Sequence, residues 1–465
     1  MVGTWAETEV DPETDSVKTV YVSDDGNAEN DGSTRATPVK SLDAAIEIIN
    51  KAKAANPAIK QGKIVLVGDV TLSFTYYKDL GSFMCLKTYT MPLTVTAETR
   101  ADGTRYSILF EGTDAREVYG LVIGGFTTFE NVRLDVQNAR GVIYENCKGL
   151  IMGEGIDVAY SNNTYISVGS QDKNASTKMV ELGNSYIEVH SGSYNRLHLV
   201  PQYPGKYTMG NMTVIAENCT FTGTGIDMCT ANWAGGEYVI NGDVNILLEE
   251  NVNFTNGNKR IQLGLASDVQ KYQINGNVFV RAVGLKITVP VKFGNKVTFA
   301  EGCGLRVSRP DSIAAKVSTP SGDNRVKAVG DLSCLPTLAG YQDNRANSEG
   351  ETYSARFVAT IPMLDGLSKV GFEITPKIGD KTGTKQTIEG TKQTIEGTMV
   401  YSSIQALGEQ VTATSLGGRY IYALEIENIP NAITEVEYTV TPYVIDGNGN
   451  RVNGLTKTIA VSAAS

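Results

Sequence analysis

The chain has 465 residues, 41% of them hydrophobic, which is enough to bury the cores of two or three domains. A formal net charge of −10 and the lack of a basic block argue against nucleic acid as a partner, because phosphate backbones bind clusters of Lys and Arg. No apolar stretch is long enough to cross a bilayer, so we expect no membrane span. With 48 Gly, 14 Pro and few helix-favouring stretches, the composition predicts an all-β protein of short strands and tight turns.

The cellular address and the state of the cysteines stay open at this level. The start of the chain, MVGTWAETEV, has neither the basic nor the apolar region of a signal peptide, so the protein is either intracellular or secreted with its signal removed. The cysteines form no CxxC pair, which argues against a zinc site or a thioredoxin-type motif, and their even number permits disulfides without requiring them. They are Cys85, Cys147, Cys219, Cys229, Cys303 and Cys334.

A compact amphipathic helix is predicted near the N-terminus. In the stretch SLDAAIEIINKA the apolar residues Leu42, Ile46 and Ile49 fall on one face, and Ser41 is placed to cap the first turn. The apolar run KIVLV follows, which is typical of a strand buried on both sides in a parallel sheet. A stack of parallel strands ends in an open apolar cross-section, so we expect the helix to cover that end.

The segment YVSDDGNAENDGSTRATPVKSLDAAIEII, residues 21–49, resembles the N-terminal opening of secreted right-handed parallel β-helix proteins, the pectate-lyase-like group. The resemblance implies an opening segment with a capping helix over residues 1–60 and a right-handed parallel β-helix over residues 61–340. It implies no single activity, because the same opening occurs in lyases, hydrolases and non-catalytic surface proteins.

The polar side chains of this opening segment have two interpretations. Carboxylate and amide oxygens suit Ca²⁺, and a turn of hydrogen-bonded polar side chains is the alternative. No other cofactor is indicated. The candidate ligands are Asp24, Asp25, Asn27, Asn30 and Asp31.

A strand, a Gly-Asn or Gly-Asp pair and a second strand recur at unequal spacing, which favours β-helix coils over a solenoid of strict period. We expect the Gly and Asn residues to adopt the left-handed backbone of a sharp corner. Two ENC segments, which begin at Glu145 and Glu217, are expected at equivalent places on different coils. The glycines of the five pairs are Gly183, Gly210, Gly242, Gly276 and Gly294.

The pattern changes after a polar, Gly-rich run near residues 335–350. Short strands of alternating or β-branched character fill residues 350–465 and predict an antiparallel β-sandwich. The tandem repeat TKQTIEGTKQTIEG, residues 384–397, is expected to lengthen an exposed hairpin. The stretches ARFVATI, VGFEI and YIYALEIENIP resemble a β-sandwich module of surface proteins from anaerobic Gram-positive bacteria. That resemblance implies an extracellular address and an accessory role.

Catalytic candidates are few. Asp157 and Asp227 occupy matching places after the two ENC segments, but three coils at ~4.8 Å per strand would separate them by roughly 14 Å. A carboxylate pair for glycoside hydrolysis needs about 5 to 9.5 Å, so this pair is rejected. Arg196 could serve as a lyase base with His190 and Glu188 nearby in sequence, and the alternative is that these strand residues only face solvent.

Aromatic residues surround the same region. Flat rings beside hydrogen-bonding side chains are what sugars bind to, and ordinary packing of strand aromatics is the alternative. The five rings are Tyr194, Tyr203, Tyr207, Trp233 and Tyr238.

These patterns favour a non-catalytic extracellular or cell-surface module for adhesion, display or glycan contact, with carbohydrate or other surface proteins as partners. The rival class is a polysaccharide lyase or glycoside hydrolase that acts on an acidic, plant or host polysaccharide. A cluster of carboxylates with an Arg or Lys within about 6 Å would favour the rival class, since charges at that range shift one another's pKa.

Overall fold

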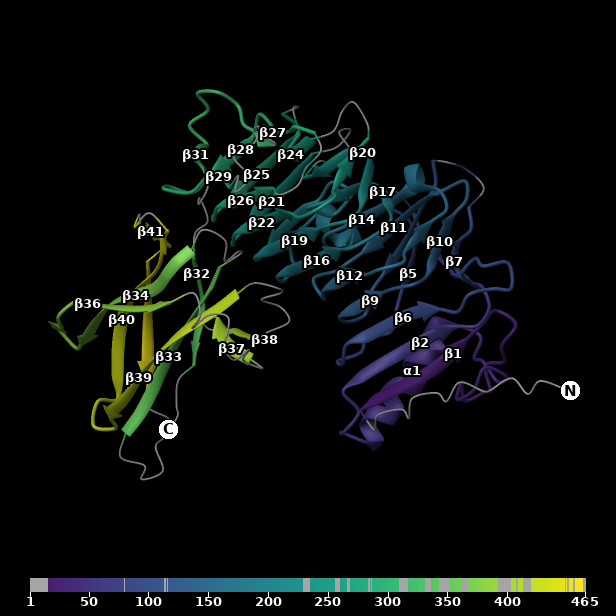
Figure 1. Ribbon diagram of the computed structural model, residues 1–465, viewed down its shortest axis with the longest axis horizontal. Coiled ribbons are helices and arrows are strands. Elements are labelled where there is room, and N and C mark those ends of the chain that lie inside the picture. Colours follow the sequence, from purple (N-terminus) through teal and green to yellow (C-terminus); the bar gives the residue numbers. More distant parts are fainter. Residues whose placement is uncertain are drawn as a thin grey trace, which may run out of the picture.

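The computed structural model shows two β-domains joined in one chain (Figure 1). No helix among the described residues is long and apolar enough to span a membrane. The structure describes residues 16–462 except 79, 113, 115, 229–234, 256–259, 266–267, 283–284, 286, 309–316, 331–335, 343–351, 362–366, 392–402, 407–408, 413–419, 448, 450 and 455.

The first domain is a parallel β-helix built on two long sheets and two short ones, which confirms the predicted fold class. The first long sheet contains β1 (Val17–Val22), β2 (Gln61–Leu66), β6 (Leu93–Ala97), β9 (Thr127–Phe129), β12 (Leu150–Met152), β16 (Ser185–Val189), β19 (Met212–Ala216), β22 (Val244–Leu248), β26 (Val278–Ala282), β29 (Leu305–Ser308) and β31 (Val326–Gly330) in that order. All of its pairings are parallel.

The second long sheet runs beside the first. It contains β4 (Thr75–Tyr77), β5 (Gly81–Cys85), β8 (Val118–Val122), β11 (Arg140–Tyr144), β14 (Thr164–Ser167), β17 (Ser193–His198), β20 (Thr220–Asp227), β24 (Arg260–Leu263), β27 (Val289–Phe293) and β30 (Val317–Ser318), with β23 (Asn253–Phe254) paired to β20. Only β4 and β5 pair antiparallel here, as a hairpin.

Most coils also contribute to a short third sheet, and the place of that sheet in the chain order differs between the early and the late coils. In the early coils a short sheet lies between the first and second long sheets in chain order, as in β6, β7, β8. In the later coils the short sheet follows the second long sheet, as in β19, β20, β21. The early short sheet is β3 (Val70–Thr71), β7 (Ser107–Phe110), β10 (Arg133–Val136) and β13 (Asp157–Val158); the late short sheet is β15 (Val180–Glu181), β18 (Lys206–Met209), β21 (Gly236–Ile240), β25 (Gln270–Ile274) and β28 (Val297–Phe299). Two short 3-10 helices, η1 (Ser161–Asn163) and η2 (Lys173–Ser176), lie near the change.

Helix α1 (Leu42–Ala55) contacts β1 and β2 at the N-terminal end of the stack (Figure 1). Ser41 Oγ accepts a hydrogen bond from the Ala44 amide, at 3.2 Å, as an N-cap should. Ile46 and Ile49 are each 1% exposed and belong to the same apolar core as the coils. The opening segment also supplies β1, so it forms the first strand of the stack as well as its cap.

The backbone conformation of the Gly-Asn and Gly-Asp pairs differs from the predicted one. None of their glycines, Asn or Asp residues has a positive φ, so the predicted left-handed backbone is wrong. The glycines instead allow close approach of neighbouring coils, since a Cβ on Gly210 would lie 2.2 Å from Asn184 Oδ1 and one on Gly242 would lie 2.4 Å from Asn211 Oδ1. Gly294 lies elsewhere, between β27 and β28.

The polar partners of these glycines form a corner ladder, defined by Asn184, Asn211, Asp243 and Asn277. The Oδ1 atom of each of the first three accepts a hydrogen bond from the backbone amide of the next, at 2.9, 2.9 and 2.8 Å. Asn277 Oδ1 accepts from the Gly304 amide at 3.2 Å. Each corner therefore satisfies a backbone donor of the following coil.

The two ENC segments lie at opposite corners, so their predicted equivalence is wrong. The first segment follows β11 and leads into β12, whereas the second follows β19 and leads into β20. They share only a left-handed asparagine, with φ of 52° at Asn146 and 45° at Asn218. Glu145 is fully buried and accepts from the amides of Cys147 and Gly149, at 2.9 and 2.7 Å.

The second domain is an antiparallel β-sandwich, as predicted. The sandwich begins at β32, which pairs with β33, so residues expected at the end of the β-helix belong to the second domain. One sheet holds β32 (Thr337–Gln342), β33 (Thr352–Ile361), β37 (Ser403–Ala406), β38 (Glu409–Thr412) and β39 (Tyr420–Pro430); the other holds β34 (Leu367–Ile378), β35 (Lys381–Thr382), β36 (Gln386–Thr391), β40 (Glu435–Asp446), β41 (Arg451–Asn453) and β42 (Lys457–Ser462).

The first copy of the tandem heptapeptide forms β36, an edge strand paired with β34, and residues 392–397 of the second copy lie outside the described residues.

The apolar core of the sandwich also includes Leu247 and Phe279 from the outer face of the first long sheet, with Ile215 packed against them. The two domains therefore share an apolar contact.

Candidate functional site

The outer face of the second long sheet carries a row of buried polar side chains. Their chain neighbours, such as Leu197 and Ile226, belong to the core, so alternation along each strand turns the polar residues to the opposite face. The row is in register across five successive strands and consists of Tyr144, Ser167, His198, Asp227 and Gln262.

Asp227 is the electrostatic centre of this row. Its Oδ1 lies 2.9 Å from His198 Nδ1, its Oδ2 accepts from Thr224 Oγ1 at 2.9 Å, and Arg196 lies 3.8 Å away. Burial alone would raise the pKa of Asp227, but the charges and hydrogen bonds of these three partners outweigh burial and lower it. Arg196 in turn lies over the ring of Tyr165, 5.5 Å from its centroid. The lyase-base candidate, Arg196, is thus a partly exposed side chain held against the buried Asp227.

The arrangement of Ser167, His198 and Asp227 side by side invites comparison with an acyl-transfer triad. Ser167 Oγ, however, donates to the carbonyl oxygens of Val168 and Val200, at 3.2 and 3.4 Å. The three residues are 0%, 3% and 1% exposed, so a substrate has no access to them in this structure. We therefore interpret the row as structural.

Residues between β17 and β18 and the residues just before η2 contact Tyr144 at one end of this row. Gln202 Oε1 accepts from the Tyr144 hydroxyl at 3.1 Å, and Gln171 Nε2 donates to the same hydroxyl at 2.7 Å. Tyr203, in the segment between β17 and β18, is partly buried, and that burial is the main reason its pKa is raised. The segment between β17 and β18 thus places Tyr203 over the outer face of the second long sheet.

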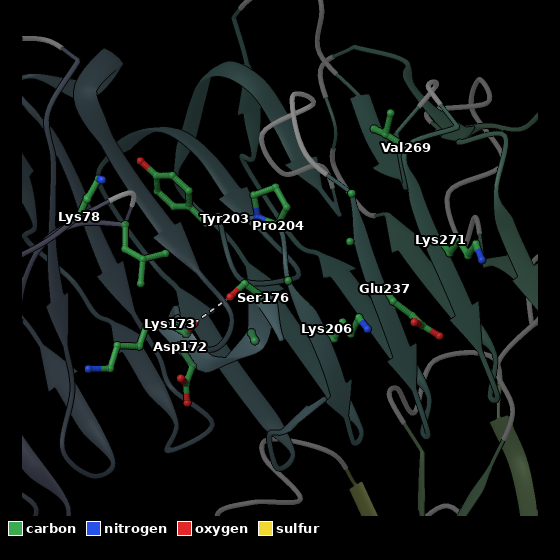
Figure 2. Close-up of a pocket in the computed structure, with 15 residues that line it drawn as sticks. Lys78, Asp172, Lys173, Ser176, Tyr203, Pro204, Lys206, Glu237, Val269 and Lys271 are labelled. Carbon is green, nitrogen blue, oxygen red and sulfur yellow. Dashed lines mark hydrogen bonds between the residues drawn. The ribbon is translucent and has the colours of Figure 1, made fainter. Parts of the chain in front are cut away.

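Tyr203 lines two cavities. The larger has a volume of about 650 Å³ and is bounded by η2 and by the first residues of β18, β21 and β25 (Figure 2). Its charged lining consists of Lys78, Asp172, Lys173, Lys206, Glu237 and Lys271.

The smaller cavity, of about 450 Å³, lies against the β4–β5 hairpin. It is lined by Tyr76, which is 73% exposed, and by polar residues that include Arg116 and Glu117. Tyr77 of the same hairpin lies near the larger cavity, with Lys173 Nζ 6.0 Å from its ring centroid. Tyr76, Tyr77 and Tyr203 are thus three accessible or partly accessible rings around one groove, which we call the Tyr203 groove.

Most of the predicted sugar-binding rings are not in this groove. Tyr194, Tyr207 and Tyr238 are 0%, 1% and 0% exposed and belong to the core, where Tyr207 stacks on Tyr238 at 5.8 Å and Tyr238 on Tyr272 at 5.0 Å. Stacking of equivalent side chains on successive coils therefore accounts for them, and they present no face to a ligand. Trp233 lies outside the described residues.

Tyr76 and Tyr77 were missed by sequence reasoning. The signal for them was the run TYYKDLG, in which adjacent tyrosines precede a tight turn with a glycine.

The three catalytic candidates do not form one site. Glu188 belongs to the first long sheet, whereas Arg196 belongs to the second. His190 instead bridges two carboxylates, with Nε2 on Glu188 and Nδ1 2.5 Å from Glu217. The hydrogen bond with Glu188 is the main cause that raises the pKa of His190 to about 9, against burial.

The oxygen-rich opening segment is a set of hydrogen-bonded turns in this structure. Asp24 Oδ2 accepts from the Thr71 amide at 2.8 Å, Asn27 Oδ1 from the Glu29 amide at 3.1 Å, and Asp31 Oδ1 from the Ser33 amide at 2.9 Å. Asn30 Nδ2 donates to the Pro38 carbonyl. Asp25 donates its own amide to Ser23 Oγ. Among the described residues, no group of three or more His, Cys, Asp or Glu side chains is arranged to hold a metal ion.

Comparison with known proteins adds no functional assignment. No protein-family model matches the chain, and no curated protein matches it.

Proposed function

We propose that the protein is a non-catalytic extracellular or cell-surface module that binds a carbohydrate in the Tyr203 groove. The observation that carries the proposal is that Tyr203 lines two cavities, of about 650 and 450 Å³, with Tyr76 lining the smaller one and Tyr77 close to Lys173 of the larger one. Aromatic faces beside polar and charged side chains suit sugar rings, which offer both apolar CH faces and hydroxyl groups.

The extracellular address is part of the same proposal. It is supported by the resemblance of residues 21–49 to the opening of secreted pectate-lyase-like proteins and by the resemblance of the sandwich to Gram-positive surface modules. Two neighbouring cavities on the side of a parallel β-helix suit contact with an extended polymer.

The rival class, a polysaccharide lyase or hydrolase, has weaker support. Asp172, one of two carboxylates that line the larger cavity, caps η2 by accepting from the Asn174 amide at 2.7 Å. Arg196 is engaged with Asp227 and Tyr165, and the row of polar side chains beside it is buried. These contacts favour binding over bond cleavage.

The test is a glycan array with the whole chain, followed by calorimetric titration of the glycans that bind. We expect Tyr203→Ala to weaken binding about tenfold, because loss of one aromatic stacking partner is worth about 1 kcal/mol or slightly more. Tyr160→Ala is the matched control, since Tyr160 is 49% exposed and lines neither cavity. Unchanged affinity in Tyr203→Ala would contradict the proposal, and release of unsaturated sugar ends that Arg196→Ala abolishes would establish the lyase instead.

A further inference from the structure

Three charged side chains follow one another along the larger cavity, on successive strands of the late short sheet. Lys206 of β18 pairs in register with Glu237 of β21, and Glu237 pairs with Lys271 of β25. All three are exposed and all three line the cavity (Figure 2). We call this positive, negative, positive series the charge ladder.

The charge ladder is free to meet a ligand. Within the described part of the chain, the side chains of Lys206, Glu237 and Lys271 take part in no hydrogen bond or ion pair with other residues. Neighbouring strands lie about 4.8 Å apart, so the two lysines stand about 10 Å apart along the stack with the carboxylate halfway between them. Lys78 and Lys173 continue the cavity beyond Lys206 (Figure 2).

An extended polysaccharide laid along the stack would place about one sugar opposite each coil, because a sugar unit advances by a distance close to the strand spacing. An acidic sugar opposite Lys206 or Lys271 would gain a favourable ionic contact. An acidic sugar opposite Glu237 would face a like charge, which costs about 1 kcal/mol at 4 Å even in water. The groove therefore discriminates between sugars according to their position in the chain.

We propose that the ligand is a polysaccharide in which carboxylate- or sulfate-bearing sugars alternate with uncharged sugars, and that Glu237 is the residue that selects it. The proposal rests on the carbohydrate-binding role of the Tyr203 groove. Lys206 and Lys271 hold two acidic sugars, and Glu237 accepts hydrogen bonds from the hydroxyl or amide groups of the sugar between them.

The test compares three probes of equal length on the whole chain at low salt: a hyaluronan oligosaccharide, which alternates glucuronate with N-acetylglucosamine, an oligogalacturonate, which is acidic at every sugar, and a neutral xylan oligosaccharide. We expect the alternating probe to bind about tenfold more tightly than the oligogalacturonate, which places a like charge opposite Glu237, and at least about tenfold more tightly than xylan, which forms neither ionic contact with the lysines.

Variants separate the roles of the ladder residues. Glu237→Gln should tighten binding of the oligogalacturonate about tenfold, while it changes hyaluronan binding less than about threefold. Lys271→Gln should weaken hyaluronan binding about tenfold and leave xylan unchanged. Lys292→Gln, an exposed strand lysine that does not line the cavity, is the control and should match the wild type.

The outcomes distinguish this inference from the proposed function. Equal affinity for all three probes, or no effect of Glu237→Gln on the oligogalacturonate, would overturn the alternating-charge inference while Tyr203→Ala could still show that the groove binds sugar. A sulfated alternating probe that binds where hyaluronan does not would support the inference with sulfate as the acidic group. Failure of every acidic and neutral probe to bind would overturn both proposals.

Discussion

The β-helix and the sandwich bury their β-strands through different kinds of contact. In the β-helix, equivalent residues of successive coils stack on one another, as Tyr207, Tyr238 and Tyr272 do. In the sandwich, unlike residues from two facing sheets meet, as Phe372 and Tyr422 do at 5.0 Å. A stack has two ends and contacts only between neighbouring coils, whereas each sheet of a sandwich is covered by the facing sheet. The ends and the joins between coils should therefore be the vulnerable places in the first domain.

The capping helix covers one end of the stack, and we expect the largest effect of a substitution there. We expect Ile46→Asp to cost about 4 kcal/mol or more, because it removes a buried apolar side chain and places a charge against the end of the stack. Soluble yield and guanidinium unfolding measure the effect. Lys51→Asp, on the exposed face of the same helix, should stay within about 0.5 kcal/mol of the wild type. Equal behaviour of the two variants would show that the helix is not a cap.

We expect the second-largest effect at the apolar contact between the two domains. Phe279 is 3% exposed and belongs to the core cluster of the sandwich, so Phe279→Ala should destabilise that contact by about 3 kcal/mol. Calorimetry of the whole chain should then show the sandwich melting at a lower temperature. Phe279→Leu keeps an apolar side chain and should cost less than about 1.5 kcal/mol. An unchanged thermogram for Phe279→Ala would mean that the two domains are energetically independent.

The corner ladder provides a test of the joins between coils. Asn211→Ala removes the acceptor for the Asp243 amide, and we expect a loss of about 1–3 kcal/mol with faster hydrogen exchange at that amide. The matched control is Asn275→Ala, which removes an exposed contact between Asn275 and Asn241 on the outside of neighbouring coils. If both variants cost the same, the buried ladder has no special role.

The pH dependence of stability reports on the corner at His190. The pKa of His190 is raised to about 9 from 6.5, so its contribution is fully present below about pH 6.5 and is lost as the pH rises through about 9. The melting temperature should therefore fall more between about pH 6 and pH 10 in the wild type than in His190→Gln. Other groups titrate in both proteins, so the difference between the two curves isolates His190, and parallel curves would refute the assignment.

The smallest effect is expected in the sandwich. Deletion of residues 391–397 leaves the sequence of β36 unchanged, because Thr398 then takes the place of Thr391. We expect the free energy of unfolding to change by less than about 0.5 kcal/mol in a urea titration. A larger loss would show that the second heptapeptide contributes to the fold of this domain.

Much of the architecture could be predicted from the sequence. The apolar face of the capping helix and the recurring Gly-Asn pairs indicated a capped stack of coils, the resemblance of residues 21–49 implied a parallel β-helix, and the change of pattern after residue 350 predicted the sandwich. The reason for the glycines could not be predicted, because the atom that Gly210 must avoid, Asn184 Oδ1, belongs to another coil. Sequence also could not tell that the two ENC segments lie at different corners, since the place of the short third sheet in the chain order changes between them.

The candidate site was predicted only in part. Tyr203, one of the five rings singled out in the sequence, lines the groove, whereas Tyr207 and Tyr238, which were grouped with it, are buried in the core. On β18 and β21 the buried Tyr207 and Tyr238 stand next to the exposed Lys206 and Glu237, so the alternation is present, but the sequence alone does not say which of the two faces is buried. The charge ladder was missed because its three members lie about a coil apart in the chain and have no sequence motif in common.

The corner ladder also has a consequence for how this protein can evolve. Its hydrogen bonds join residues that are 27, 32, 34 and 27 positions apart, so each join is chemically alike while the loops between them differ in length. A duplication or deletion of one whole coil would recreate the same join and leave both the cap and the sandwich untouched. The length of the stack, and of the surface along its side, is therefore a trait that selection can adjust in whole coils.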